Sequence, residues 1–175
     1  MQGMQLRLLI GGVVAVGGLA TVGVYLATHR GSHPNPVPPT PPVPPAEPGV
    51  VVADAARTPG TLNPAVTQAT IGATICQSGY TATVRPSSSY TTHLKLAQMV
   101  EYGESGLPSN YEEDHLIPLE LGGNPTDPQN LWPEPQPHAR SVDTIENNLH
   151  QQVCAGTVTL SQAQATIVQI KHASG

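Results

Sequence analysis

The segment EEDHLIPLELGGNPTDPQNLW (residues 112–132) combines an acidic run, a histidine and several turn-forming residues. Asp114 and His115 stand directly before a short apolar run, which ends at the pair Gly122-Gly123. A second apolar stretch begins after Asn130. This order predicts a strand, a loop and a returning strand, and the fold depends on that unit.

Asp114 and His115 have the side chains that metal-assisted hydrolysis of a phosphodiester needs. An oxygen ligand holds a divalent ion, and a base with an unperturbed pKa of about 6.5 activates water. Neighbouring residues of a strand point to opposite faces, so a bend is needed to bring both to one site. Asn130 is placed to tie the returning strand to the loop after His115. The plain alternative is an acidic surface loop that contains a histidine.

The residues before this segment show short periodic patterns. Apolar residues alternate with threonines over residues 80–84 and predict a strand. Thr92 is the expected N-cap of a helix that runs to Tyr102. The side chains expected on its buried side are Leu96, Met99 and Val100.

Two further helices are expected after the segment. Apolar residues at three- and four-residue spacing predict a helix over residues 140–153, which Gly156 ends. Its expected buried residues are Val142, Ile145, Leu149 and Val153. Thr159 and Gln162 form a capping box for a last helix that carries Leu160, Ala163, Ile167 and Ile170. Residues 71–175 are therefore expected to form one α+β domain.

The N-terminal part of the chain has a different composition. Residues 1–30 contain an uncharged apolar stretch, residues 8–27, that is long enough to span a bilayer as a helix. We expect a single-pass signal anchor in the cell membrane, and the alternative is a cleaved signal peptide and a secreted protein. Residues 31–70 are expected to be an extended linker, because nine of the fifteen residues 34–48 are proline.

The two cysteines, Cys76 and Cys154, lie near opposite ends of the expected domain. A disulfide between them would persist in an oxidising compartment, whereas two unrelated buried thiols are the alternative. Together with the apolar N-terminal stretch, the pair places the domain outside the cytoplasm.

DHLIPLELGG followed by NLW resembles the HNH endonuclease motif, which reads Asp-His-x-x-Pro, a Gly-Gly turn and then Asn-Leu. Residues 74–170 are similar to small bacterial exported HNH-type proteins. The resemblance implies a small ββα-metal core with extra helices. By position it makes Asp114 a metal ligand, His115 the general base and Asn130 the residue that steadies the loop.

The last metal ligand of the motif has no clear counterpart, because the usual His-x-x-x-His or His-x-x-x-Asn ending is absent. His138 lies about where a ligand is expected. Its rivals share one face of the helix expected after it and are Asp143, Glu146, Asn147 and His150. Glu113 is a further candidate for a place beside the metal. The implied cofactor is one divalent ion, Mg²⁺ or Mn²⁺, with Zn²⁺ as a further option. The paired CxxC motifs of many HNH proteins are also absent, and a Cys76–Cys154 disulfide would replace that staple.

The resemblance predicts a metal-dependent endonuclease that faces outside, with DNA rather than RNA as substrate and no obligate protein partner. The charge predicts weak, non-specific binding, because the chain has a net charge of −5 and residues 101–146 hold ten acidic residues against Arg140 alone. The alternative is a non-catalytic cell-surface domain that binds a metal or a partner on a retained HNH-like scaffold. A hydrolase of another phosphodiester is a third possibility.

Overall fold

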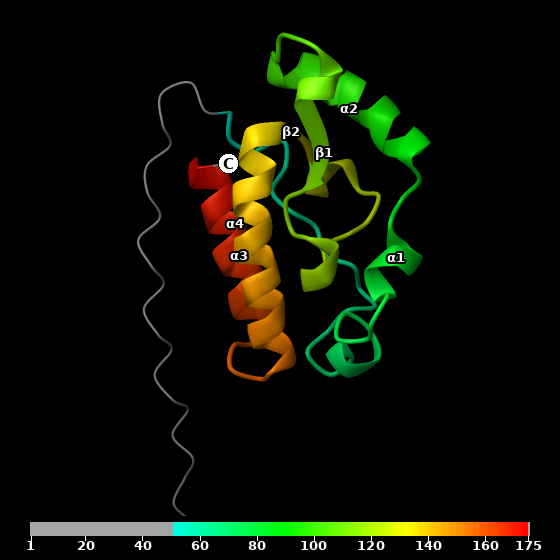
Figure 1. Cartoon of the computed structure of the whole chain (residues 1–175), viewed down its shortest axis with the longest axis vertical. Coiled ribbons are helices and arrows are strands. Elements are labelled where there is room, and N and C mark those ends of the chain that lie inside the picture. The colour runs from blue at the N-terminus through cyan, green and yellow to red at the C-terminus, as the bar shows by residue number, and fades with distance from the viewer. Residues whose placement is uncertain (1–50, 175) are drawn as a thin grey trace, which may run out of the picture. The chain divides into compact units, whose positions relative to one another are not determined.

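The computed structural model describes residues 51–174, which form a mixed α+β domain with a two-stranded sheet and four α-helices (Figure 1). The apolar stretch 8–27 and the proline-rich residues 34–48 lie outside the described residues. Within residues 51–174, no helix has both the length and the apolar character that a membrane span requires.

The elements follow one another along the chain with short connections. The helices are α1 (Tyr80–Val84), α2 (Ser88–Tyr102), α3 (Gln136–Cys154) and α4 (Leu160–Ser174), and the strands are β1 (Tyr111–His115) and β2 (Leu131–Pro135). The strands pair antiparallel with Asp114 opposite Trp132 and His115 opposite Leu131. The predicted strand–loop–strand unit is therefore confirmed.

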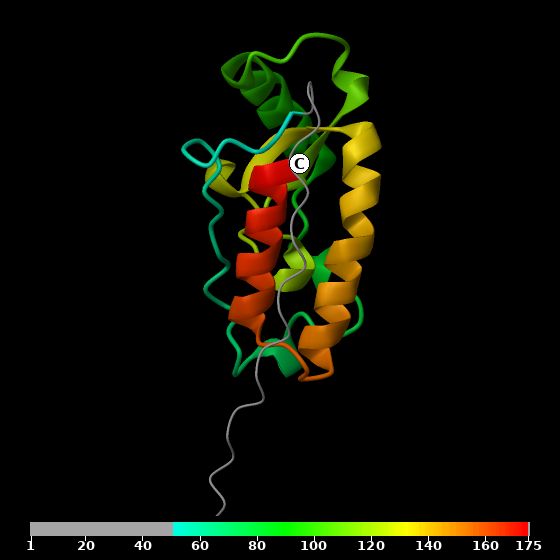
Figure 2. The ribbon, with the colours of Figure 1, turned by 90° about the vertical axis from the view of Figure 1, so that its left-hand side faces the viewer.

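The hairpin lies between α2 on one side and the α3–α4 pair on the other (Figure 1). The helices α3 and α4 run antiparallel to each other (Figure 2). Apolar side chains from both helices and from the inter-strand loop make the main core. Its buried members are Val66, Ile75, Ile117, Leu121, Val142, Leu149, Val153, Leu160, Ala163 and Ile167.

The folded domain begins earlier than the sequence predicts. Residues 51–70 were expected to belong to the linker, but they run along α4, from Ala53 at its end to Gln68 at its start (Figure 2). The Ala53 N–H donates to the Lys171 carbonyl oxygen at 3.3 Å, and the Leu160 N–H donates to Gln68 Oε1 at 2.7 Å. Hydrogen bonds and two isolated buried apolar residues, Ala53 and Val66, hold this segment. It has no periodic apolar face, so no periodic pattern in the sequence marks it.

The strand predicted over residues 80–84 is wrong, because Tyr80–Val84 is the short helix α1. Gly79 precedes it with φ +83°, a left-handed turn that redirects the chain into the helix. Arg85 ends the helix in extended backbone before Pro86. A five-residue alternating pattern fits either structure, and no neighbouring strand among the described residues pairs with it.

The helix α2 begins earlier than predicted and buries a different face. Ser87, rather than Thr92, is its N-cap and accepts the Tyr90 N–H at 3.3 Å. Met99 is buried as expected, but Leu96 and Val100 are 47% and 80% exposed. Gln98 takes the inward position, because its Nε2 donates to the Leu131 carbonyl oxygen at the start of β2 and to the Pro128 carbonyl oxygen before it. Polar contacts rather than apolar ones thus set the orientation of this helix.

The helices α3 and α4 follow the predicted periodicity with two differences. The helix α3 begins at Gln136 rather than residue 140, and Ile145 is 37% exposed while Glu146 points inward. The predicted capping box is confirmed, because the Thr159 N–H donates to Gln162 Oε1 at 2.9 Å and the Gln162 N–H returns to Thr159 Oγ1 at 3.3 Å.

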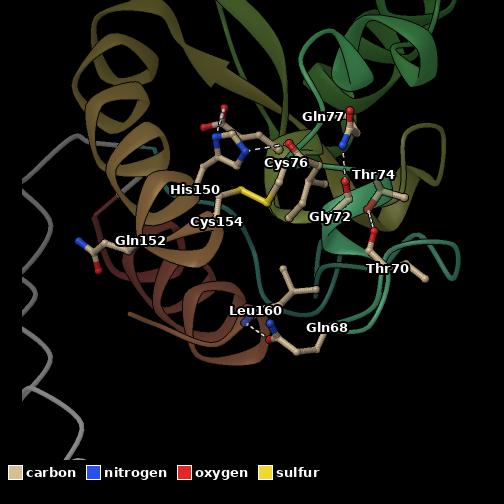
Figure 3. The surroundings of a disulfide bond; sticks show 12 residues. Gln68, Thr70, Gly72, Thr74, Cys76, Gln77, His150, Gln152, Cys154 and Leu160 are labelled. Atoms are coloured by element: carbon tan, nitrogen blue, oxygen red, sulfur yellow. Dashed lines mark hydrogen bonds and ion pairs between the residues drawn. A yellow bond between two sulfur atoms is a disulfide. The ribbon is translucent and has the colours of Figure 1, made fainter. Parts of the chain in front are cut away.

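Cys76 and Cys154 form a disulfide (Figure 3). The predicted cross-link is therefore confirmed, and the alternative of two unrelated thiols is wrong. The Cα atoms of the two cysteines lie 5.6 Å apart although the residues are 78 positions apart in the chain. His150, one turn before Cys154 on α3, lies beside the bond, with Nε2 2.9 Å from the Ile75 carbonyl oxygen. The disulfide thus ties the end of α3 to the loop that precedes α1.

Candidate active site

His115 is the last residue of β1, and one nitrogen of its imidazole is hydrogen-bonded to the backbone of the inter-strand loop. Nε2 lies 3.0 Å from the Pro125 carbonyl oxygen, which can only accept, so Nε2 carries the proton and Nδ1 carries the lone pair. Burial lowers the pKa of His115 below its ordinary value, against the opposing effects of the Pro125 hydrogen bond and the Asp114 charge. The neutral, accepting imidazole is therefore the dominant form at neutral pH.

Asn130 fixes the loop that connects the two strands. Its Oδ1 accepts the Ile117 N–H at 3.0 Å, while its Nδ2 donates to the Ile117 and Asn124 carbonyl oxygens at 3.1 and 2.9 Å. The amide is fully buried, and its two bonds to Ile117 are shielded from water. The loop that carries Pro125 to His115 is held in place by this side chain.

Gly123 is required in the same loop because the backbone passes too closely for a side chain. A Cβ at this position would lie 1.7 Å from the Ile117 carbonyl oxygen and 2.7 Å from Asn130 Nδ2. The Gly-Gly pair of the motif therefore has a packing reason at its second position.

Asp114 forms the centre of a buried charge cluster with α3 and α4. Lys171 Nζ donates to Asp114 Oδ2, and it also lies 2.6 Å from Glu146 Oε1. Burial alone would lower the pKa of Lys171, but the two carboxylates outweigh it and raise that pKa above its ordinary value. Burial would raise the pKa of Asp114, but the Lys171 charge and the hydrogen bonds from Glu134 and Lys171 together outweigh it and lower that pKa, so this carboxyl stays ionised.

Two further carboxyls of this cluster are shifted toward their protonated forms. Burial, with the Asp114 charge, raises the pKa of Glu134 to about 9. No N–H or O–H donor of another group within residues 51–174 reaches a Glu134 oxygen. A hydrogen bond between the Glu134 and Asp114 carboxyls therefore requires Glu134 to carry the proton. Burial also raises the pKa of Glu146 to about 7, although Lys171 opposes it.

Asp114 and His115 meet in a cavity of about 210 Å³ beside α3, here called the α3 cavity. Its wall is formed by Thr81, Arg85, Glu112, Asp114, His115, Pro118, Leu119, Glu120, Asp143, Glu146 and Asn147. The two neighbours of the strand reach one site because His115 is where β1 ends and the chain bends. Five carboxyl side chains and one arginine line it, so the α3 cavity attracts cations.

A second cavity of about 320 Å³, here called the α2 cavity, lies between α2 and β1. It shares Arg85, Glu112 and His115 with the α3 cavity, so the two cavities meet at these residues. Glu113 lines it from the opposite face of β1 to Asp114, and neither Glu113 carboxyl oxygen has a hydrogen-bond partner within the described chain. Burial raises the pKa of Glu113 to about 8.

The metal ligands predicted from the sequence lie at different places in the structure. Asp143 and Glu146 share the α3 cavity with Asp114, whereas Glu113 lines the α2 cavity. His138 lies in the first turn of α3 and lines neither cavity, and its buried Nδ1 has no hydrogen-bond partner within residues 51–174.

Sequence reasoning missed Lys171, Glu134 and the place of Arg85. Lys171 continues the buried positions of α4 one turn after Ile167, and a lysine on such a face signals a buried ion pair. Glu134 is two residues after Trp132 on β2 and therefore points to the same side as that buried indole. Nothing in the sequence relates Arg85 to His115.

The donors of the α3 cavity fit a hard divalent ion, because they are carboxylate and amide oxygens. These donors do not form a complete, closely spaced set of metal ligands. Within residues 51–174, only one group of three His, Cys, Asp or Glu residues has ligand atoms that all lie within 4.8 Å of one another. This group is Cys76, His150 and Cys154, and its two cysteines are joined in the disulfide. The donor chemistry suits Mg²⁺, which is commonly bound through one or two carboxylates and keeps several waters.

No protein-family model, no curated protein and no solved structure matches this chain.

Proposed function

We propose that the domain is a metal-dependent phosphodiester hydrolase of the HNH type, with a ββα-metal core made by β1, β2 and α3. The observation that carries the proposal is the state of His115. Its Nε2 is committed to the Pro125 carbonyl, so Nδ1 is the accepting nitrogen, and His115 lines the acidic α3 cavity. A neutral histidine with a fixed tautomer is what a general base requires.

In the proposed reaction, His115 Nδ1 takes a proton from a water molecule as the water oxygen attacks phosphorus. The bond from phosphorus to the leaving oxygen breaks, and that oxygen takes up a proton afterwards. Lys171 keeps Asp114 ionised, and Asn130 holds the loop that orients the imidazole. Asp114, together with Asp143 or Glu146, would hold a divalent ion, which supplies charge stabilisation at the phosphoryl and leaving oxygens.

The compartment proposed for this activity is outside the cytoplasm. The Cys76–Cys154 disulfide supports it, because such bonds persist in oxidising surroundings. The membrane anchor at residues 8–27 remains part of the proposal, with secretion after cleavage as its alternative.

The test uses the full-length chain in a non-ionic detergent with the disulfide intact. Plasmid and single-stranded DNA are incubated with Mg²⁺, Mn²⁺, Zn²⁺ or EDTA. We expect metal-dependent cleavage that falls about 10²- to 10⁴-fold in His115→Ala. The control is His93→Ala, which removes an exposed histidine from α2. Equal rates in the two variants would overturn the assignment of the base.

The non-catalytic alternative is favoured by one observation. Lys171 already occupies Asp114 Oδ2, so a metal at Asp114 competes with a buried ammonium group. If the folded wild-type protein cleaves nothing with any metal, the domain is a retained scaffold that binds a partner or an ion.

A further inference from the structure

The described residues hold few positive charges, and most of them are already paired with carboxylates or lie outside both cavities. The cationic side chains of residues 51–174 are Arg57, Arg85, Lys95, Arg140 and Lys171. Arg57 pairs with Asp54 at 2.7 Å, and Lys171 is buried between Asp114 and Glu146. The other three have no carboxylate partner within 4.0 Å among the described residues, and two of these three line the α2 cavity beside His115.

Lys95 is held with its ammonium group in a fixed place at this cavity. Nζ donates to the Pro108 carbonyl oxygen at 2.9 Å and to the Tyr111 carbonyl oxygen at 2.8 Å. An ammonium group has three N–H donors, so one remains for a ligand. Because the side chain is already ordered, binding an anion there costs little additional side-chain entropy.

Arg85 stands where the α2 and α3 cavities meet, since it lines both of them together with His115. An arginine at this junction is able to contact two successive phosphates of one strand, because its guanidinium group has five donors in a planar fork.

The rest of the α2 cavity suits a sugar-phosphate unit. Ser88, Thr91 and Thr92 repeat at the spacing of one helical face, and Lys95 lies on the same face. This face offers three hydroxyl groups and a cation next to the imidazole. The volume of about 320 Å³ is at the lower end of the range for sites that hold small ligands.

We propose that the α2 cavity binds the nucleotide unit adjoining the scissile phosphate, with Arg85 and Lys95 as its phosphate contacts. The substrate is then a nucleic-acid strand rather than an isolated small phosphodiester. The position of the scissile bond rests on the function proposed above. Glu112 and Glu113 also line the cavity, so the contacts act at short range against an acidic surface, and binding is weak and salt-sensitive.

The first test measures binding without turnover. The full-length chain, in a non-ionic detergent with EDTA, is titrated into a fluorescein-labelled single-stranded octanucleotide, and Kd is read by fluorescence anisotropy between about 20 and 200 mM NaCl. Arg85→Gln is expected to raise Kd about tenfold and to reduce the slope of log Kd against log[NaCl] by about 0.7. Arg140→Gln removes the same charge outside both cavities and is expected to change neither. Equal effects of the two substitutions would overturn the proposal.

The second test fills the cavity. Thr92→Trp places an indole on the α2 cavity wall, and Ala97→Trp places one on an exposed position of the same helix outside both cavities. Thr92→Trp is expected to raise Kd for the octanucleotide at least tenfold, whereas Ala97→Trp binds like the wild type. Equal Kd values in these two variants, or no binding by wild type at low salt, would overturn the proposal.

Hydrolysis of bis(p-nitrophenyl) phosphate separates the two proposals. Wild type that binds the octanucleotide in an Arg85-dependent way but hydrolyses neither DNA nor this small diester supports the cavity and overturns the catalytic function. Wild type that hydrolyses the small diester but does not bind the octanucleotide supports the catalytic function and overturns the proposal for the α2 cavity. A fall in the ratio of DNA cleavage to small-diester cleavage in Thr92→Trp supports both.

Discussion

Lys171 determines the charge balance behind the candidate active site. It is the one cation in contact with Asp114 and Glu146 among residues 51–174, and it also donates to the His115 carbonyl oxygen at 2.9 Å. A buried ion pair adds little stability over an apolar replacement of the whole group, but loss of one member leaves an unpaired buried charge. The lysine is therefore more costly to remove than its exposed counterparts.

We predict that Lys171→Met lowers the free energy of unfolding by about 3–5 kcal/mol at pH 7. Asp114 and Glu146 would then lack their cation, so protonation would relieve them and the loss would be smaller near pH 5. Urea unfolding at both pH values measures the effect, with Arg140→Met as the control on an exposed site. An equal loss at both pH values would contradict the charge explanation.

Glu134 gives the second residue-scale prediction. Its pKa is about 9 in the folded protein and about 4.5 when unfolded, so its contribution to stability is complete below pH 4.5 and is lost as the pH rises toward 9. Glutamine keeps the shape and a donor toward Asp114 without a titrating proton.

Glu134→Gln is therefore expected to gain stability relative to the wild type as the pH rises from about 5 to 9. One such group contributes about 1.4 kcal/mol per pH unit within that window. Unfolding free energies at pH 6, 7 and 8 test this prediction. The control is Glu101→Gln at an exposed position, for which the plot of unfolding free energy against pH should run parallel to that of the wild type. Parallel curves for Glu134→Gln as well would show that Glu134 is ionised in the fold.

At the scale of elements, the loop between β1 and β2 is where the motif and the fold coincide. Asn130 bonds to both backbone groups of Ile117, and Gly123 passes against the same carbonyl. The loop places the Pro125 carbonyl against His115, so its geometry sets the tautomer of the proposed base.

Gly123→Ala is expected to destabilise the domain by about 3 kcal/mol or more, because its Cβ would overlap the Ile117 carbonyl oxygen and force the loop to move. Phosphodiester cleavage should fall with it, since the His115–Pro125 contact depends on the loop. Gly72→Ala is the control, because its Cβ would meet nothing within 4 Å. Thermal unfolding distinguishes them, and similar melting temperatures would refute the packing argument.

The sequence predicted this hairpin and the two C-terminal helices because each carries its own local signal. The Gly-Gly turn, the Thr159–Gln162 capping box and the apolar spacing of α3 all depend on neighbouring residues alone. The pairing of Asp114 with Lys171 lies beyond such signals, since it joins residues 57 positions apart.

The wrong elements failed for a related reason. The helix α1 and the buried face of α2 are decided by tertiary contacts, and α2 turns Gln98 inward to cap carbonyls of the β2 region while leaving Val100 outside. Polar contacts of this kind overrule apolar periodicity, which therefore misplaced Leu96 and Val100.

At the scale of the whole described domain, distant segments are fastened by a few cross-connections. Residues 51–70 are tied to both ends of α4, and the Cys76–Cys154 bond closes a loop that contains α1, α2, the hairpin and α3. The core within that loop holds one tryptophan and no phenylalanine, so its apolar burial is modest. The cross-link is expected to supply a large share of the stability.

The double substitution Cys76→Ser with Cys154→Ser is expected to lower the free energy of unfolding by about 4 kcal/mol, because the open chain regains the entropy of a loop of nearly eighty residues. Urea unfolding with and without dithiothreitol measures it. The reductant should destabilise the wild type by a similar amount and leave the double variant unchanged. The disulfide lies at the far end of α3 from β2, so the hairpin and its His115–Pro125 contact should survive in whatever fraction stays folded. A variant that stays folded but no longer cleaves DNA would mean that the cross-link also positions Asp143 and Glu146 on α3.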